Sequence, residues 1–241
     1  MSALARSPFV DGYVFLEGPR WHDGCLWVSD IWAHKVYCIK EDGRAETAAD
    51  VPQRPSGLGF LPDGTPLIVS MQDRCVYRLE TGALQLHADL SGSVAADIND
   101  MVVDDQGRAY VGDMGYDLFG GGPSAPGNIV LVEPDGRHRI VADGLDFPNG
   151  MVITNGGDTL VVAESFGERL RAFDRAANGD LRNPRVYATL EGLVPDGICL
   201  DVDGNIWVAG AMGGAFVQVN PPPMRQSPAS SAAVTAARCT A

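Results

Sequence analysis

The chain has 241 residues, of which 18 are basic and 31 acidic, and its formal net charge at pH 7 is −13. A protein this negative repels nucleic-acid phosphates, which argues against a DNA- or RNA-binding role. No apolar run approaches membrane-spanning length, and residues 1–8 hold no apolar stretch of signal-peptide length. We therefore expect a cytoplasmic protein that has no membrane partner.

The cysteines predict neither a disulfide framework nor a thiolate zinc site. Their number is odd and no C-x-x-C pair occurs; they are Cys25, Cys38, Cys75, Cys199 and Cys239. We expect unpaired thiols in a reducing cytosol.

One pattern recurs along the chain at intervals of about 40 to 50 residues, the range typical of propellers and solenoids. Each copy is a short apolar strand, a turn containing glycine and a second apolar strand; the copies cover residues 17–30, 56–70, 99–113, 149–164 and 196–210. A third apolar stretch follows every copy, at residues 35–39, 75–79, 128–132, 170–173 and 216–219. A fourth strand can be drawn in most copies, for example at 85–89 and 185–189. Four short antiparallel strands per repeat predict the blades of an all-β propeller, with about five blades present.

The residue that opens each copy carries a side-chain oxygen in all five cases. These openers are Glu17, Ser56, Asn99, Asn149 and Asp196, and each lies seven or eight residues before the hairpin glycine. Equivalent positions on the innermost strands should converge at one end of a propeller channel. Carboxylates brought together there would repel each other unless a cation bound between them, and oxygen-only ligands select Ca²⁺, Mg²⁺ or Mn²⁺.

The alternative for each opener is a turn-capping role, which Ser, Asn and Asp commonly have. That role is the better interpretation of Ser56, whereas Glu17 is a poor turn former. For Asn149 and Asp196 the spacing alone leaves the two interpretations even.

Four motifs at these positions resemble the family of senescence marker protein (regucalcin), gluconolactonase and luciferin-regenerating enzyme. They are Leu16-Glu-Gly-Pro-Arg-Trp21, Asn99-Asp100, Phe147-Pro-Asn-Gly-Met151 and Pro195-Asp-Gly-Ile198. The resemblance covers about residues 9 to 219 and implies a six-bladed propeller with one divalent metal ion at the channel mouth.

The resemblance also implies a role for each opener except Ser56. Glu17, Asn149 and Asp196 would bind the metal ion, Asn99 would contact the substrate, and Asp196 would also act as general base. The implied cofactor is one divalent cation, with Ca²⁺ as first choice and Zn²⁺, Mn²⁺ or Mg²⁺ as alternatives. The implied activity is metal-dependent hydrolysis of a small lactone.

The sequence departs from the family pattern in two places. Family members that act on sugar lactones tend to have arginine two residues before the Asn of the Asn-Asp motif, whereas this chain has Asp97, so gluconolactone is a doubtful substrate. After Val219 the strand pattern stops, and residues 220–241 form a Pro-, Ser- and Ala-rich tail that we expect to be disordered. The propeller domain is thus predicted over residues 1–219, with its last blade missing or replaced.

Other functions stay open from the sequence alone. The chain could be a non-catalytic propeller that binds a divalent cation or a protein partner, or a related propeller enzyme acting on phosphotriesters or glucosides. The glycine-rich loop at residues 115–127 either covers the channel mouth, with Tyr116 and Phe119 meeting substrate, or is a plain surface loop.

Overall fold

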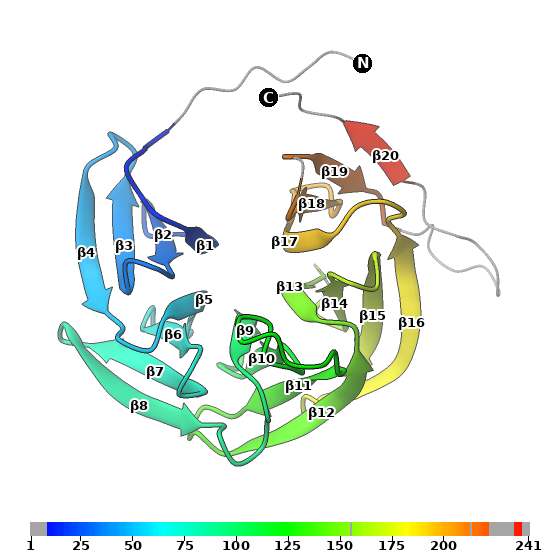
Figure 1. Ribbon diagram of the computed structural model, residues 1–241, viewed down its shortest axis with the longest axis horizontal. Coiled ribbons are helices and arrows are strands. Elements are labelled where there is room, and N and C mark those ends of the chain that lie inside the picture. Colours follow the sequence, from blue (N-terminus) through cyan, green and yellow to red (C-terminus); the bar gives the residue numbers. More distant parts are fainter. Residues whose placement is uncertain (1–8, 155, 213, 222–233, 238–241) are drawn as a thin grey trace. The chain divides into compact units, whose positions relative to one another are not determined.

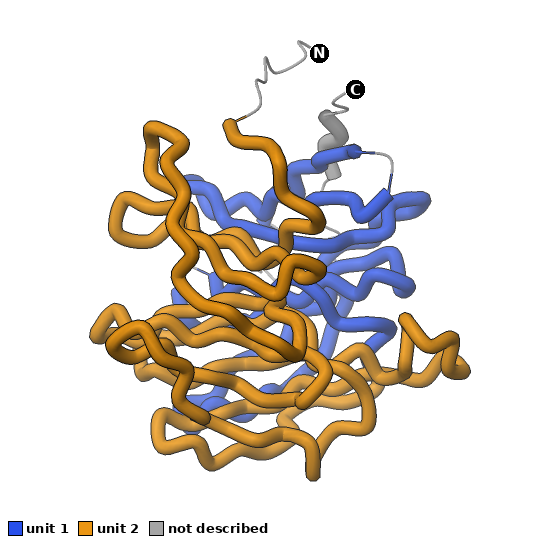
Figure 2. Tube along the Cα trace, turned by 60° about the vertical axis from the view of Figure 1, so that its left-hand side comes forward, with its two compact units in different colours: residues 1–6, 145–241 blue, residues 7–144 orange. Residues whose placement is uncertain are grey.

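The computed structural model describes residues 9–154, 156–212, 214–221 and 234–237. In these ranges the chain forms twenty β-strands (Figure 1), and no helix there is long and apolar enough to cross a membrane. The chain divides into two compact units (Figure 2), which we describe separately. The larger unit holds residues 7–144, and the smaller holds residues 145–241 with residues 1–6.

The larger unit contains three four-stranded antiparallel sheets. The first comprises β1 (Leu16–His22), β2 (Cys25–Asp30), β3 (Lys35–Lys40) and β4 (Ala45–Asp50). The second comprises β5 (Pro55–Phe60), β6 (Pro66–Ser70), β7 (Cys75–Glu80) and β8 (Ala83–Asp89). The third comprises β9 (Ile98–Val103), β10 (Ala109–Asp113), β11 (Gly127–Val132) and β12 (His138–Leu145), whose last residue belongs to the smaller unit.

The smaller unit contains two sheets of the same kind. One comprises β13 (Pro148–Ile153), β14 (Thr159–Glu164), β15 (Arg169–Arg175) and β16 (Leu181–Thr189). The other comprises β17 (Pro195–Leu200), β18 (Ile206–Gly210), β19 (Phe216–Val219) and β20 (Val234–Ala237).

In all five sheets the strands lie in chain order, each antiparallel to the one before it. This meander is the blade of a β-propeller, which confirms the predicted fold class and the five predicted blades. The second strands β6, β10 and β14 are buried along almost their whole length. Their sequences are continuous apolar runs, because both faces of a blade are covered within a propeller.

The core of each unit lies between consecutive blades. In the larger unit Val36, Val51, Leu58 and Ile68 form one cluster between the first two blades. In the smaller unit the two blades pack through a larger cluster that includes Val161, Leu170, Ile206 and Val208. Consecutive blades also meet through their first strands, β1 with β5 and β5 with β9 in one unit, and β13 with β17 in the other.

Part of the C-terminal tail forms a strand, contrary to the sequence-based expectation. Strand β20 pairs antiparallel with β19, and Val219 lies opposite Val234. The expectation of a tail without strands is therefore wrong for these four residues, because a fourth strand needs only backbone pairing and no apolar period of its own. Residues 222–233 and 238–241 lie outside the described residues.

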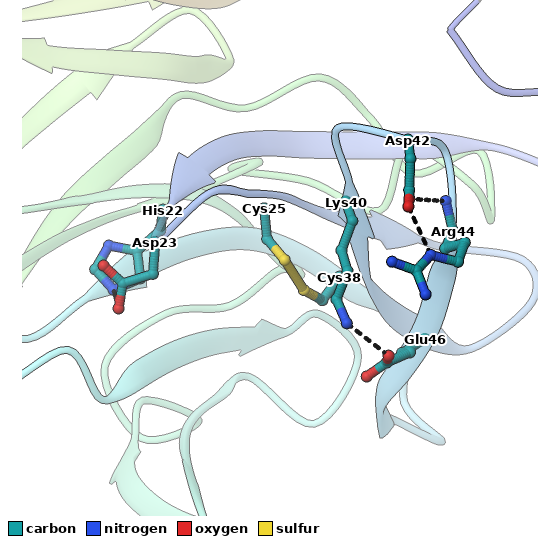
Figure 3. The surroundings of a disulfide bond; sticks show 8 residues. All are labelled: His22, Asp23, Cys25, Cys38, Lys40, Asp42, Arg44 and Glu46. Atoms are coloured by element: carbon teal, nitrogen blue, oxygen red, sulfur yellow. Dashed lines mark hydrogen bonds and ion pairs between the residues drawn. A yellow bond between two sulfur atoms is a disulfide. The ribbon is translucent and has the colours of Figure 1, made fainter.

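The prediction of unpaired thiols is wrong for two of the five cysteines. Cys25 on β2 and Cys38 on β3 form a disulfide, with Cα atoms 5.7 Å apart (Figure 3). The sequence could not show this because only the hairpin register, which sets Cys38 opposite Trp27, brings the two residues near each other. Cys75 is a free thiol, and Cys239 lies outside the described residues.

Asp201 fixes the hairpin between β17 and β18. Its carboxylate accepts hydrogen bonds from the side chains of Asn205 at 2.9 Å, Trp207 at 3.1 Å and Gln218 at 3.1 Å. These bonds, led by that from Asn205, lower the pKa of Asp201 to about 2. Since a carboxylate with a lowered pKa stabilises the fold only when ionised, its contribution is complete above the usual aspartate pKa of about 4 and disappears as the pH falls through about 2.

We expect the variant Asp201→Asn to be less stable than the native protein at pH 5 and to approach it in stability as the pH falls toward 2. The measurement is the free energy of unfolding by denaturant at several pH values. Asp203→Asn is the matched control, because Asp203 lies exposed on the same turn. Equal pH profiles for the two variants would contradict the role of Asp201.

Candidate active site

Each opener occupies the same structural position in its blade. It is the second residue of the first strand: Glu17 in β1, Ser56 in β5, Asn99 in β9, Asn149 in β13 and Asp196 in β17. The equivalence that the sequence spacing predicted is therefore present blade by blade.

A β-bulge lies near the start of the first strand in all five blades, and in four of them it contains the opener. At each bulge, two residues of the first strand stand against one of the second; Asp196 and Gly197, for example, lie opposite Ala209 between the pairs Pro195–Gly210 and Ile198–Val208. The same shift contains the openers of β5, β9 and β13, whereas in β1 Glu17 pairs with Ser29 and the bulge follows at residues 18 and 19. Bulges re-aim side chains and are common beside active sites, so the four openers within a bulge leave the usual alternation of the strand.

The residue after an opener is glycine in four blades, and three of these glycines stand against the next blade. A Cβ atom at Gly18 would lie 2.8 Å from the carbonyl oxygen of Ser56, and one at Gly57 would lie 2.7 Å from the Cα of Asp100. In the smaller unit a Cβ at Gly150 would lie 2.6 Å from the carbonyl oxygen of Asp196. The glycines let consecutive first strands approach backbone to backbone, which brings the openers within each unit close together.

In the larger unit, hydroxyl groups fix Ser56 and Asn99. The hydroxyl of Ser29 donates to the carbonyl oxygen of Ser56 at 2.6 Å, and the hydroxyl of Ser56 donates to Oδ1 of Asn99 at 3.2 Å. Asn99 is 7% exposed. Because its Oδ1 accepts from Ser56, its Nδ2 is the end of the amide that can donate to a ligand.

Arg20 holds the Asn-Asp motif from β1, the first strand two blades before β9. Its Nη2 donates to Oδ1 of Asp100 at 2.8 Å and to the carbonyl oxygen of Met101 at 2.9 Å. The side chain of Asp100 is 8% exposed in this ion pair. Arg20 therefore acts as a positioning residue for Asn99 through Asp100.

In the smaller unit, Ser165 links the openers of two blades. Its hydroxyl donates to the carbonyl oxygen of Pro195 at 2.7 Å, and Nδ2 of Asn149 lies 3.2 Å from the same hydroxyl oxygen. Since the only hydroxyl proton of Ser165 goes to Pro195, Asn149 must donate to Ser165. Oδ1 of Asn149 therefore faces away from Ser165 and is the end of the amide that can bind a cation.

The structure thus brings Glu17, Ser56 and Asn99 together in one unit and Asn149 and Asp196 together in the other. Ser56 serves as a linker between blades, in line with its interpretation as a structural residue. The chemistry of the predicted ligands fits a hard cation, since two carboxylates and an amide oxygen supply only oxygen donors. Among the described residues there is no group of three or more His, Cys, Asp or Glu side chains that could hold a metal ion, and the predicted set has only two such members.

Ser29, Ser165 and Arg20 were missed by the sequence analysis. Ser29 lies near the end of β2 opposite Glu17, and Ser165 directly follows β14, where Asn149 donates a hydrogen bond to it. A serine at the end of a strand is too common to single out, so only the hydrogen bonds show their role. Arg20 lies within a motif that carried the resemblance, but its partner Asp100 is 80 residues away.

A protein with this fold and these openers is a β-propeller with polar side chains at the start of its blades. Residues 15–235 match the sequence model of the family described as "SMP-30/Gluconolactonase/LRE-like region". The chain belongs to this family.

Two relatives illustrate the match. Pentonolactonase XacC of Haloferax volcanii is 27% identical over 209 residues, which are 84% of this chain and 68% of that protein. Regucalcin of Gallus gallus is 30% identical over 227 residues, which are 88% of this chain and 73% of regucalcin.

Solved structures show the same fold. A gluconolactonase from Xanthomonas campestris superposes with a TM-score of 0.74 at 24% identity, covering 86% of this chain and 73% of that chain. A calcium-binding regucalcin from Agrobacterium tumefaciens superposes with a TM-score of 0.72 at 23% identity, covering 86% of this chain and 70% of that one.

Proposed function

We propose that this protein is a metal-dependent hydrolase of small lactones. The observation that carries the proposal is the set of five openers at the second residue of every first strand, with carboxylates at Glu17 and Asp196 and amides at Asn99 and Asn149. Membership of a family with a pentonolactonase and a gluconolactonase among its relatives supports a lactone substrate.

Glu17, Asp196 and Oδ1 of Asn149 would hold one divalent cation, with Ca²⁺ as first choice and Zn²⁺, Mn²⁺ or Mg²⁺ as alternatives. A regucalcin structure described as a calcium-binding protein supports this choice. The bound cation would supply Lewis acidity toward the lactone carbonyl.

The residues of the chain would perform the proton transfers and position the substrate. Asp196 accepts a proton from a water molecule, and the oxygen of that water forms a bond to the carbonyl carbon. The ring carbon–oxygen bond then breaks, and the proton passes from Asp196 to the departing alkoxide, which gives an open-chain hydroxy acid. Asn99 would orient the lactone by donating a hydrogen bond from Nδ2.

We expect the purified chain to hydrolyse members of a lactone panel, to lose this activity in EDTA, and to regain it when Ca²⁺, Mn²⁺ or Zn²⁺ is added. Release of acid, followed with a pH indicator, measures the reaction. Hydrolysis that persists unchanged in EDTA would contradict metal dependence. Binding of Ca²⁺ without hydrolysis of any lactone would favour the second candidate, a non-catalytic propeller that binds a cation.

The predicted cytoplasmic location stays a prediction. One argument for this location was that the cysteines are unpaired. Cys25 and Cys38 form a disulfide, and structural disulfides are rare in the reducing cytosol, so that argument does not hold for these two residues.

A further inference from the structure

Arg54 and Asp97 occupy equivalent positions in adjacent blades of the larger unit. Each lies two residues before an opener, Ser56 or Asn99, and one residue before a first strand. The N–H of Met71 donates to the carbonyl of Arg54 at 2.9 Å, and its carbonyl accepts at 3.4 Å from the N–H of Ile98, the residue after Asp97. The two residues therefore lie at the same end of adjacent blades, the end where Asn99 lies.

The guanidinium of Arg54 is held in place but lacks a polar partner. It lies over the ring of Trp32, with its Cζ 4.2 Å from the ring centroid, and Cζ is 5.6 Å from the centroid of Phe119. Its Nε is buried and forms no hydrogen bond with any described residue. A buried donor without a partner costs about 1–3 kcal/mol, so a native arginine in this state is suited to a ligand that supplies the acceptor.

The backbone at Arg54 is also strained. Its φ is +69°, in the left-handed region, and Pro55 follows it. Left-handed geometry is unfavourable for a side chain such as arginine, and proline restricts the residue before it further. Strain of this kind persists where surrounding structure enforces it, and it concentrates at ligand-binding sites.

The loop at residues 115–127 completes this region. Asp117 organises its tip by accepting from the N–H of Gly120 at 2.7 Å, and its carbonyl accepts from the N–H of Gly122 at 2.7 Å. The loop places Phe119 against Trp32, with ring centroids 5.7 Å apart. Phe119 is 48% and Trp32 41% exposed, so both rings present apolar surface to solvent beside Arg54.

The charges of this region favour a neutral ligand that both donates and accepts hydrogen bonds. Burial, and next the carboxylate of Asp117, raise the pKa of Asp97, while Arg54 and Arg74 oppose that shift. A carboxylate ligand would meet repulsion from Asp97 and Asp117, and an ammonium group would meet repulsion from Arg54. A hydroxyl group fits, because it can accept from Arg54 and donate to Asp97.

We propose that Arg54 and Asp97 form a subsite for the hydroxyl groups of a neutral lactone, bordered by Trp32 and Phe119. This assignment rests on the proposed lactone hydrolysis. The carboxylate of Asp97 cannot donate a hydrogen bond to a hydroxyl oxygen of the lactone. Arg54, in the neighbouring blade, supplies that donor. Sites built to bond a hydroxyl group discriminate strongly against analogues that lack it, so Arg54 determines specificity for hydroxylated over plain lactones.

The test compares D-glucono-1,5-lactone with δ-valerolactone, which has no hydroxyl groups. We expect Arg54→Gln to raise KM for the hydroxylated lactone about tenfold or more, with kcat changed by less than about threefold. The KM for δ-valerolactone should stay within about twofold of the native value. Arg44→Gln is the matched control, because Arg44 is exposed and pairs with Asp42. Equal effects on both lactones, or no effect on either, would overturn the assignment.

A second variant and a binding measurement keep the test decisive. Arg54→Lys retains the charge and the aliphatic stem but loses the planar fork, so it should show a smaller loss for the hydroxylated lactone alone if Arg54→Gln does not fold. Calorimetric titration with D-gluconolactam and δ-valerolactam reports binding without turnover. If the native chain hydrolyses neither lactone, the proposed function fails, while binding of gluconolactam that depends on Arg54 still supports the subsite. Absent binding, or binding independent of Arg54, overturns it.

Discussion

Replacing Asp196 by asparagine is expected to lower kcat for lactone hydrolysis by about three orders of magnitude. Asparagine keeps the shape of the side chain and one oxygen but cannot accept the proton of the attacking water, and general-base catalysis is worth about 10²–10⁴ in rate. The fold should survive, because Asp196 is half-buried at the start of β17 and the bulge there is set by the backbone of Pro195 and Ile198. Initial rates on the most reactive lactone of the panel, with circular dichroism of the variant, measure both effects.

The variant Asp196→Asn also distinguishes the role of Asp196 in proton transfer from its role in cation binding. An amide oxygen remains a possible ligand for a hard cation, so calorimetry should show cation binding that is weakened while turnover is nearly lost. Asp203→Asn removes the same charge from an exposed turn in the same blade and should leave both quantities unchanged. Native turnover in Asp196→Asn would remove Asp196 from the mechanism.

The repeat made the fold and the openers predictable from the sequence. Short apolar strands and glycine turns recur in every blade at similar spacing, so a weak signal in one copy is supported by the other four. Glu17 and Asp196 differ in side-chain length, yet their offsets of seven and eight residues from a hairpin glycine were enough to make them equivalent. The bulge near the start of each first strand left no separate signal, because an extra residue in a strand does not change the apolar pattern around it.

Features that depend on a single pairing could not be predicted. The Cys25–Cys38 disulfide requires the register of one hairpin, and β20 requires backbone pairing in a segment of tail without apolar alternation. Arg54 shares the offset of Asp97, but its stacking on Trp32 depends on how the 115–127 loop folds. Such contacts depend on how separate segments of the chain pair and pack, and a single sequence does not show this.

Gly150 is expected to be the least replaceable glycine of the smaller unit. A Cβ atom there would lie 2.5 Å from the backbone nitrogen of Ile198 and 2.6 Å from the carbonyl oxygen of Asp196, and backbone atoms cannot rotate away as a side chain can. Gly150→Ala should therefore push β13 and β17 apart and destabilise the fold by about 1–3 kcal/mol. Because the displaced segment carries Asp196, and a shift of about 1 Å in a reacting group can cost about 10² in rate, activity should fall about a hundredfold even in the folded fraction.

Gly197→Ala is the matched control for this substitution. Gly197 follows its opener as Gly150 does, but no described atom lies within 4 Å of the position that a Cβ atom would take there. The same change of one methyl group therefore meets open space, and stability and turnover should stay close to native. If Gly197→Ala proved as damaging as Gly150→Ala, the loss of stability and activity would come from the reduced backbone freedom of alanine at the bulge and not from contact with the next first strand. A loss confined to Gly150→Ala would mean that close contact between first strands holds Asn149 and Asp196 in position for catalysis.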